Sequence, residues 1–379
     1  MEVRTTTFHA GAGWSGPLPS ELDSPQTLVL AFADSRYASD PEPLAMLDAA
    51  FPQSLLLGCS TSGEIAGAQL NDTSVSVAVA RFEHTRLRRA TAAFAAACDS
   101  HAAGARLAEE LAAPDLRAVF LLSDGLGVNG SALVDGLAGR LGSEVPIAGG
   151  LASDGNRFER TWVLDRAQPQ SGRIGAVGFY GERLHVDFGC GGGWLDFGPE
   201  RLVTRSVGNV LYELDGRPAL DLYRDYLGNL AAGLPGSALL FPLSVRRHDG
   251  ADSVVRAVLG VDEAARSVTF AGDVPQGGVA RLMRGNTERL IGGAGEAARQ
   301  ALGRLAAERA ALIVSVSCVG RRLALGERTE EEIESIVEAA PQDRAHVGFY
   351  SYGEISPLAL GGASELHNQT ITVTTFCEA

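Results

Sequence analysis

The six-residue pattern Gly-x-x-[Ser/Thr]-x-Gly occurs three times in this chain, and similar segments precede each copy. The copies are Gly58–Gly63, Gly150–Gly155 and Gly348–Gly353. Each follows an apolar run, a polar turn, a helical stretch and a short apolar strand. Because recurrence of whole units indicates a repeat architecture, the sequence predicts related β–α–β units whose strand-end loops could converge on one site.

Strand and helix patterns alternate along the chain, which favours an α/β fold, with α+β as the alternative. Duplicated β–α–β–β units are expected to form mixed sheets covered by helices. Residues 74–81 alternate with period two, as in a half-buried strand, and residues 85–97 are expected to complete a hairpin with them. Further expected elements are helices at 43–50, 100–111, 131–141 and 286–308, and a strand at 238–242.

Length and composition indicate a soluble protein of two domains. A chain of 379 residues is long for one domain, and the Gly-rich stretch 189–198 marks a change of region. No apolar run approaches 18 residues and the N-terminus does not resemble a signal peptide, so we expect no membrane span and a cytoplasmic location. Five scattered cysteines fit a reducing compartment.

Charge and the choice of basic residue exclude several classes of function. The net charge of −14 argues against a nucleic-acid partner. All 32 basic residues are arginine, because the chain contains no lysine. A P-loop, a pyridoxal or Schiff-base enzyme and a protein kinase each need a lysine. These three classes are therefore excluded.

The repeated loops offer backbone N–H groups and hydroxyls at strand ends, a combination that suits a carboxylate or another anion. The alternative is that the glycines only make tight turns between packed layers. For a small-molecule ligand we predict contacts from the loops themselves and from polar residues near them. The candidates are Cys59, Ser60, Thr61, Gly149, Gly150, Ser153, Ser351 and Tyr352 in the loops, with Asp124, Cys318, Arg321 and Glu354 as polar contributors.

Two other motifs suggest different chemistry. Residues 125–130 match Gly-x-Gly-x-x-Gly, the pattern of a dinucleotide-binding site. Two observations argue against such a site: the carboxylate of Asp124 would lie where the pyrophosphate approaches, and the other units lack the pattern.

Cys318 has cationic neighbours that could activate a thiol, so a cysteine-dependent enzyme is an open alternative to a non-catalytic protein. The histidines lack paired metal-ligand spacing, although one axial ligand for haem cannot be recognised by spacing.

Several segments, in order along nearly the whole chain, resemble the FIST proteins. They are Gly58–Ile65, Pro146–Gly155, Asn209–Leu227, Gly272–Pro275, Arg281–Met283, Ser317–Arg321 and Gly348–Ile355. The resemblance implies a FIST N-terminal sensory domain at 27–205 and a FIST C-terminal domain at 206–379.

The same resemblance implies a non-catalytic bacterial sensor that binds small molecules such as amino acids. Such a sensor would signal through a partner, for example a histidine kinase or a cyclic-di-GMP enzyme. One FIST subgroup binds haem and senses nitric oxide. If this chain is similar to that subgroup, His185 or His367 is the candidate axial ligand.

Overall fold

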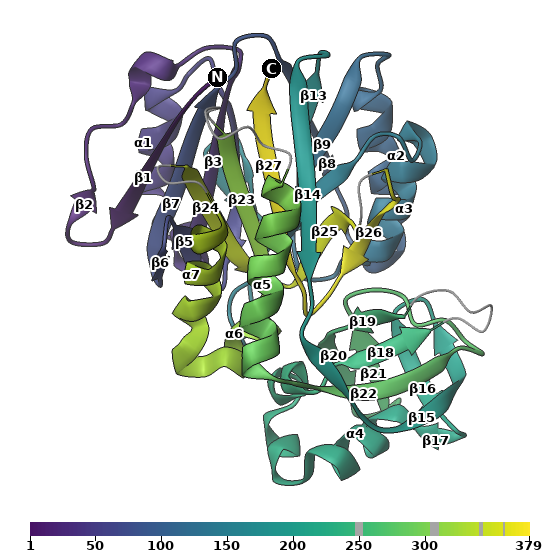
Figure 1. Cartoon of the computed structure of the whole chain (residues 1–379). Helices are drawn as coiled ribbons and strands as arrows, with labels where there is room; N and C mark the ends of the chain where they lie inside the picture. Colours follow the sequence, from purple (N-terminus) through teal and green to yellow (C-terminus); the bar gives the residue numbers. More distant parts are fainter. Residues whose placement is uncertain (247–252, 304–310, 341–343, 359–360) are drawn as a thin grey trace.

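The structure is a computed structural model that describes residues 1–246, 253–303, 311–340, 344–358 and 361–379. It consists of two bodies (Figure 1). The larger one, here called the three-unit body, contains residues 1–191 and the described residues from 286 to 379. The smaller one, the eight-stranded domain, contains the described residues from 194 to 285 and lies below it. The boundary predicted at 205/206 falls inside one strand of this domain, β15 (Trp194–Val207).

Three related units build the larger body, in agreement with the prediction of duplicated units and mixed sheets. In each unit a central strand pairs in parallel with the second strand and antiparallel with the last. The units are β3 (Thr27–Asp34), α1 (Glu42–Ala50), β4 (Leu55–Thr61) and β7 (Ser74–Arg81); β9 (Leu116–Ser123), α3 (Gly130–Leu141), β10 (Ile147–Leu151) and β13 (Arg173–Tyr180); and β23 (Ala311–Cys318), α6 (Val319–Leu325), α7 (Thr329–Ala339), β24 (Ala345–Ser351) and β27 (Ile371–Glu378).

The units exchange their hairpins in a cycle. The hairpin that follows the glycine loop of each unit joins the sheet of another unit: the first joins the third, the second joins the first, and the third joins the second. The hairpins are β5 (Glu64–Ala66) with β6 (Gln69–Asn71), β11 (Val163–Asp165) with β12 (Gln168–Gln170), and β25 (Gly353–Pro357) with β26 (Ser364–His367). Every sheet of this body therefore depends on strands from two units.

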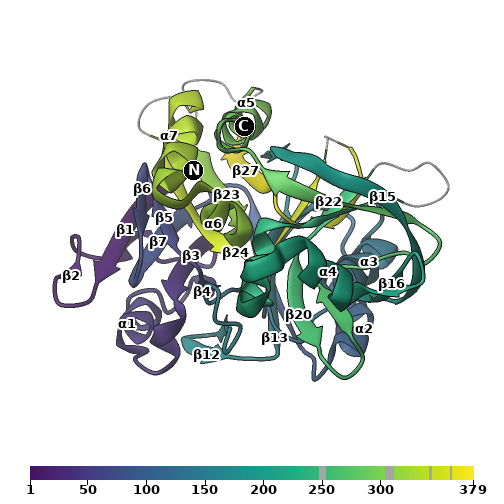
Figure 2. The same ribbon diagram turned by 90° about the horizontal axis from the view of Figure 1, so that it is seen from below.

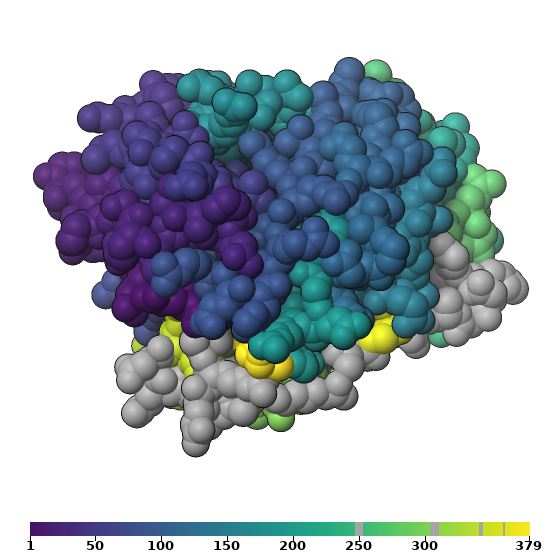
Figure 3. Space-filling model, turned by 90° about the horizontal axis from the view of Figure 1, so that it is seen from above, coloured from purple at the N-terminus to yellow at the C-terminus, as the bar shows by residue number. Residues whose placement is uncertain are grey.

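The remaining elements extend or cover these sheets. The outer strands are β1 (Glu2–His9), β2 (Gly13–Trp14), β8 (Arg86–Ala93) and β14 (Leu184–Gly191), and the further helices are α2 (Ser100–Leu111) and α5 (Thr287–Leu302). Apolar side chains of all three units pack in the centre, where Phe32 of the first unit stacks on Phe349 of the third at 4.6 Å. In the view from above, the first unit (purple) and the second (blue) adjoin across the face (Figure 3).

The second body is a sheet of eight strands in which the long β15 belongs to both halves. Figure 2, from below, shows it beside α6. Its other elements are β16 (Val210–Leu214), β17 (Arg217–Pro218), α4 (Ala219–Leu227), β18 (Leu243–Arg246), β19 (Val254–Arg256), β20 (Val258–Asp262), β21 (Ser267–Phe270) and β22 (Val279–Gly285). Short 3₁₀ turns lie at Ser20–Leu22, Ser35–Ala38, Ala97–Asp99, Gly228–Gly233, Gly236–Leu240 and Gly326–Arg328.

Three local predictions differ from the structure. The predicted strand at 238–242 is largely a 3₁₀ turn, Gly236–Leu240. The predicted hairpin of β7 and β8 is wrong, because β7 lies between β1 and β3 whereas β8 pairs with β13 in another sheet. β7 is also buried on both faces, with its valines toward the α1 side and its alanines toward the centre. The helix expected over 286–308 is observed as far as Leu302, and residues 304–308 lie outside the described residues.

Candidate functional site

The three glycine loops meet in a closed ring, which we call the strand-end ring. Each loop is hydrogen-bonded to the next one through its backbone. The bonds run from Ser62 N to Tyr350 O (2.9 Å), from Ser153 N to Ser60 O (3.0 Å) and from Tyr352 N to Leu151 O (3.2 Å). The Ser153 hydroxyl adds a 2.5 Å bond to the same Tyr350 oxygen. The loops therefore converge in space, and several of their backbone N–H and carbonyl groups are already hydrogen-bonded to one another.

One glycine of each unit allows the parallel strands to approach. A Cβ on Gly58, Gly149 or Gly348 would lie 2.3, 1.8 or 2.2 Å from a carbonyl oxygen of the neighbouring central strand. No side chain fits at such a distance. In the second unit the equivalent residue is Gly149, one position before the Gly150 that begins the sequence match. These glycines have an architectural role.

In each unit a buried carboxylate accepts hydrogen bonds from residues at the beginning of the last strand. Glu64 accepts hydrogen bonds from the backbone and hydroxyl of Ser74, at 3.0 and 2.8 Å. Glu354 accepts the same pair from Thr370, at 3.2 and 3.0 Å. In the second unit Asp124, from the end of β9, accepts from the backbone of Gly172. Glu64 and Glu354 thus occupy equivalent positions in their units, whereas Asp124 approaches the last strand from the end of the central strand β9.

Burial raises the pKa of each of these three groups. It raises the pKa of Glu64 and of Glu354 to about 8, and that of Asp124 above its usual range. Sequence reasoning identified Asp124 and Glu354 but missed Glu64. The shared pattern [Ser/Thr]-x-Gly-Glu, in which the hydroxyl of Thr61 or Ser351 donates to the glutamate three residues later, could have found it.

All twelve residues predicted to contact a ligand are buried around this ring. Burial raises the pKa of the Cys59 and Cys318 thiols well above the usual range, which is the opposite of activation. Arg321 is fully buried in an ion pair with Glu332 at 2.6 Å, and it donates to the carbonyls of Gly192 and Leu290 at 2.7 and 2.8 Å. Its guanidinium is therefore committed to contacts within the fold.

The residues present do not fit a haem at either candidate histidine. His367 is buried, its Nε2 lies 2.8 Å from the carbonyl oxygen of Ser356, and burial lowers its pKa to about 4. His185 is an exposed residue of β14. No histidine lines any of the four cavities described here.

The residues that the structure describes contain no cluster of three or more metal-ligating side chains. No helix among the described residues has the length and apolar composition to cross a bilayer.

Two cavities open beside the strand-end ring. One, of about 320 Å³, is lined by Asp124, Leu126 and Thr161 among others, and the second, of about 280 Å³, by Asp34, Asp154 and nearby arginines. Of the twelve predicted residues, Asp124 is the one that lines a cavity described here. The other eleven are enclosed.

The largest of the four cavities described here is a groove of about 630 Å³ between the two bodies, which we call the interbody groove. The three-unit body lines it with α3, Leu358 and β26, and the eight-stranded domain with β18, β19 and residues 273–276. The valines and leucines of these segments make apolar walls, while Asp135, Asp273, Glu365 and Arg256 supply charge. Its volume and mixed lining are typical of small-molecule sites, which often lie at domain interfaces.

Arg256 holds the two bodies together along this groove. Its guanidinium donates to the carbonyl oxygens of Asp273 and Leu366, both at 3.0 Å, and to the Ser131 hydroxyl at 3.4 Å. Leu366 belongs to β26 and Ser131 to α3, so one buried arginine connects the domain to two elements of the three-unit body. Sequence reasoning missed it, because no local pattern marks a contact across 110 residues.

A second polar contact crosses the same boundary at the N-terminus of α3. Asn129 caps this helix by accepting from the backbone of Ala132 at 3.1 Å, and its amide donates to Asp273 Oδ1 at 2.6 Å. In the Gly-x-Gly-x-x-Gly segment, the helix terminus that would face a pyrophosphate thus has the Asp273 carboxylate beside it. Gly272 allows the approach, since a Cβ there would lie 2.6 Å from the Ser131 hydroxyl.

Comparison with known proteins gives a consistent family match. A model of the FIST N domain matches residues 27–217, and a model of the FIST C domain matches residues 219–357. Two uncharacterized proteins of Mycobacterium tuberculosis, MT0656 of strain CDC 1551 and Rv0628c of strain H37Rv, are each 25% identical over 382 residues, covering 94% of this chain and 92% of the relative.

Among solved structures, a cyanuric acid hydrolase from A. caulinodans aligns over 100% of this chain and 99% of its own, with 9% identity and a TM-score of 0.39. A TM-score this low does not establish a shared fold.

Proposed function

This chain belongs to the FIST family, whose domains are implicated in sensing small ligands in signalling proteins, and on that premise we propose that it is a non-catalytic sensor whose ligand binds in the interbody groove. The observation that carries this proposal is the lining of the groove by both bodies. A ligand there contacts both at once. Its binding energy can therefore favour one relative placement of the bodies over another.

The signal would leave as a shift in the population of such placements. A ligand shifts an equilibrium only by its difference in affinity for the two states, and a tenfold difference corresponds to about 1.4 kcal/mol. The polar contacts across the boundary include those of Arg256 and Asn129 and two of Gln369, which donates to the Leu239 carbonyl at 2.9 Å and accepts from Trp194 Nε1 at 2.6 Å. A difference of this size is comparable to the net contribution of one hydrogen bond to a charged group.

The strand-end ring would transmit this shift. The segment after Leu366 passes directly from the groove into the ring: Asn368 donates to the carbonyl of Tyr352 at 3.3 Å, and Thr370 donates to Glu354. Gln369 between them has a φ of 63°, which is strained for a residue with a side chain. In this proposal the predicted ring residues act by positioning, since their side chains are enclosed.

The charges along the groove favour a ligand with a cationic amine and a short apolar part. Asp273 and Glu365 line it together with valines, and the Arg256 guanidinium is already bonded to backbone oxygens. A free amino acid is one such molecule. The receiver of the signal would be a separate protein, such as a histidine kinase or a cyclic-di-GMP enzyme, in the cytoplasm.

Hydrogen exchange measured by mass spectrometry tests this assignment. The full chain is first screened by thermal shift against free amino acids and small amines, and each compound that raises Tm is then added at saturation. We expect slower exchange in α3, in β26 and in the segment 366–370. Protection confined to segments outside the groove and the ring would contradict the proposal.

A further inference from the structure

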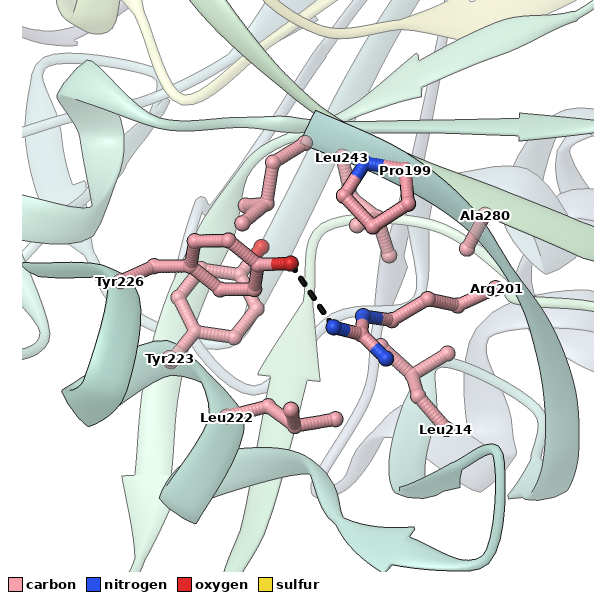
Figure 4. Close-up of a pocket in the computed structure, with 9 residues that line it drawn as sticks. Pro199, Arg201, Leu214, Leu222, Tyr223, Tyr226, Leu243 and Ala280 are labelled. Carbon is pink, nitrogen blue, oxygen red and sulfur yellow. Dashed lines mark hydrogen bonds between the residues drawn. The ribbon is translucent and has the colours of Figure 1, made fainter. Parts of the chain in front are cut away.

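The eight-stranded domain contains a separate hollow between α4 and its sheet (Figure 4). Its walls are almost entirely apolar, with leucines from α4 and from three strands, and Ala280 and Pro199 complete them. The enclosed space is about 10 Å³, roughly the minimum needed for one water molecule. In this closed state the hollow admits nothing larger.

Two buried polar atoms at this hollow have no hydrogen-bond partner among the described residues. They are the hydroxyl of Tyr223 and the Nε of Arg201. Tyr223 is only 1% exposed, and burial raises the pKa of its hydroxyl, so the group stays a neutral donor. A buried hydroxyl without a hydrogen-bond partner lowers the stability of the folded protein. The fold keeps this hydroxyl at position 223, where a phenylalanine would remove the unsatisfied group.

Arg201 and Tyr226 close the mouth of the hollow. Arg201 Nη2 donates to the Tyr226 hydroxyl at 2.9 Å, the contact drawn as a dashed line in Figure 4. Nη1 of Arg201 donates to Asp215 at 2.9 Å, and its side chain keeps 24% of its surface exposed. The leucines behind them are buried, whereas the side chains of Arg201 and Tyr226 are partly exposed.

We propose that this hollow is a second binding site, which takes a small carboxylic acid with a compact apolar body. The two unsatisfied groups are both donors, an O–H and a guanidinium N–H, so the ligand must supply acceptors. A carboxylate supplies them to both, and it would share the Arg201 guanidinium with Asp215. The apolar body would lie among the leucines. Turning of the Tyr226 side chain would supply the space that the closed hollow lacks.

Benzoate and hexanoate are the probes that test this proposal on the full chain, by thermal shift and calorimetry at a fixed ionic strength. Benzyl alcohol and benzamidine serve as the neutral and cationic comparisons. We expect the two carboxylates to raise Tm and to bind more tightly than either comparison. Tyr223→Phe should weaken benzoate binding roughly tenfold without loss of stability, because it removes a hydroxyl that has no partner. Arg201→Met should weaken it further.

Tyr212→Phe is the matched control, since Tyr212 lies on β16 beneath Arg205 and does not line the hollow. Val254→Trp, which narrows the interbody groove, should leave benzoate binding unchanged, so that failure of the groove and failure of the hollow are distinguishable. Absence of carboxylate binding overturns the proposal. Benzoate binding by Tyr223→Phe and Arg201→Met that is as tight as binding by the unaltered chain also overturns it. In that case one enclosed water molecule satisfies the two donors.

Discussion

Arg256, in the eight-stranded domain, donates a hydrogen bond of 3.0 Å from Nη1 to the carbonyl oxygen of Leu366, in the three-unit body. The same guanidinium reaches Asp273 and Ser131. One side chain thus joins the domain, α3 and β26 at the groove. Because the residue after Leu366 begins the path into the strand-end ring, this contact is where ligand binding and the fold of the repeats would meet.

Arg256→Met should loosen the junction of the two bodies. The substitution keeps the length of the side chain but leaves buried carbonyl oxygens without donors, so we expect the free energy of unfolding to fall by about 3 kcal/mol. Urea unfolding followed by tryptophan fluorescence measures it. Arg224→Met is the control, because its exposed pair with Glu263 should contribute less than about 1 kcal/mol. Equal losses in the two variants would contradict this role for Arg256.

The buried Glu64 should make stability fall as pH rises. Its pKa is about 8 in the folded protein against 4.5 for the free group, so the folded state binds the extra proton. The stability contributed by the protonated Glu64 side chain is fully present below pH 4.5 and is lost as pH rises through 8. Glu64→Gln should therefore flatten the decline of stability between pH 5 and pH 8.

Glu378→Gln provides a control of opposite sign for this pH dependence. Burial opposes ionisation of Glu378, but hydrogen bonds from Glu83, Thr85 and His84 prevail and hold its pKa below the usual range. The stability contributed by the ionised Glu378 side chain is therefore lost as pH falls. Urea unfolding at several pH values compares the two variants, and a Glu64→Gln profile parallel to that of the unaltered protein would refute the assignment.

Gly149→Ala should be far more damaging than a glycine substitution on an open surface. The new Cβ would meet the Leu121 carbonyl at 1.8 Å, in a backbone with φ of 138°, so we expect a loss of about 3 kcal/mol or more. Gly139→Ala in α3 has nothing within 4 Å. It should be neutral or stabilise by up to about 1 kcal/mol. Thermal unfolding of the two variants measures the difference, and similar Tm values would show that the ring does not need this close approach.

Arg321→Met should destabilise the protein strongly because it leaves Glu332 as an unpaired buried charge. Both side chains are fully buried, and such losses are typically about 3–5 kcal/mol. Combining it with Glu332→Gln should recover part of the loss, which a double-mutant cycle quantifies. A double variant no more stable than Arg321→Met would argue against the pair as the cause.

Local patterns predicted many elements of this fold, but not how the units combine. The helix at Ser100–Leu111 and the strand at Ser74–Arg81 have the predicted bounds, because alanine content and period-two alternation are local signals. Strand pairing is not local. The cyclic exchange of hairpins joins β5 to β24 across some 280 residues, and the loops alone do not reveal it.

The candidate site shows the same limit. The loops could be located from glycine spacing, yet whether they enclose a ligand depends on the packing of three units around them. Asp124 and Glu354 were predicted as polar contributors to a ligand site, whereas the partner of Arg321, Glu332, is part of a helix with no distinguishing pattern. Arg256 and Asp273 acquire their roles only when the two bodies meet.

Calorimetry of ligand binding to a groove-filled variant decides whether the ligand binds in the interbody groove. Val254 lines the interbody groove and is partly exposed, so Val254→Trp narrows the groove with little disturbance of the core. Val337→Trp, on the outer face of α7, is the control. For the amino acid or amine that most raises Tm, we expect binding at least tenfold weaker in Val254→Trp and unchanged in Val337→Trp. Equal affinity in both variants and the unaltered chain would contradict it.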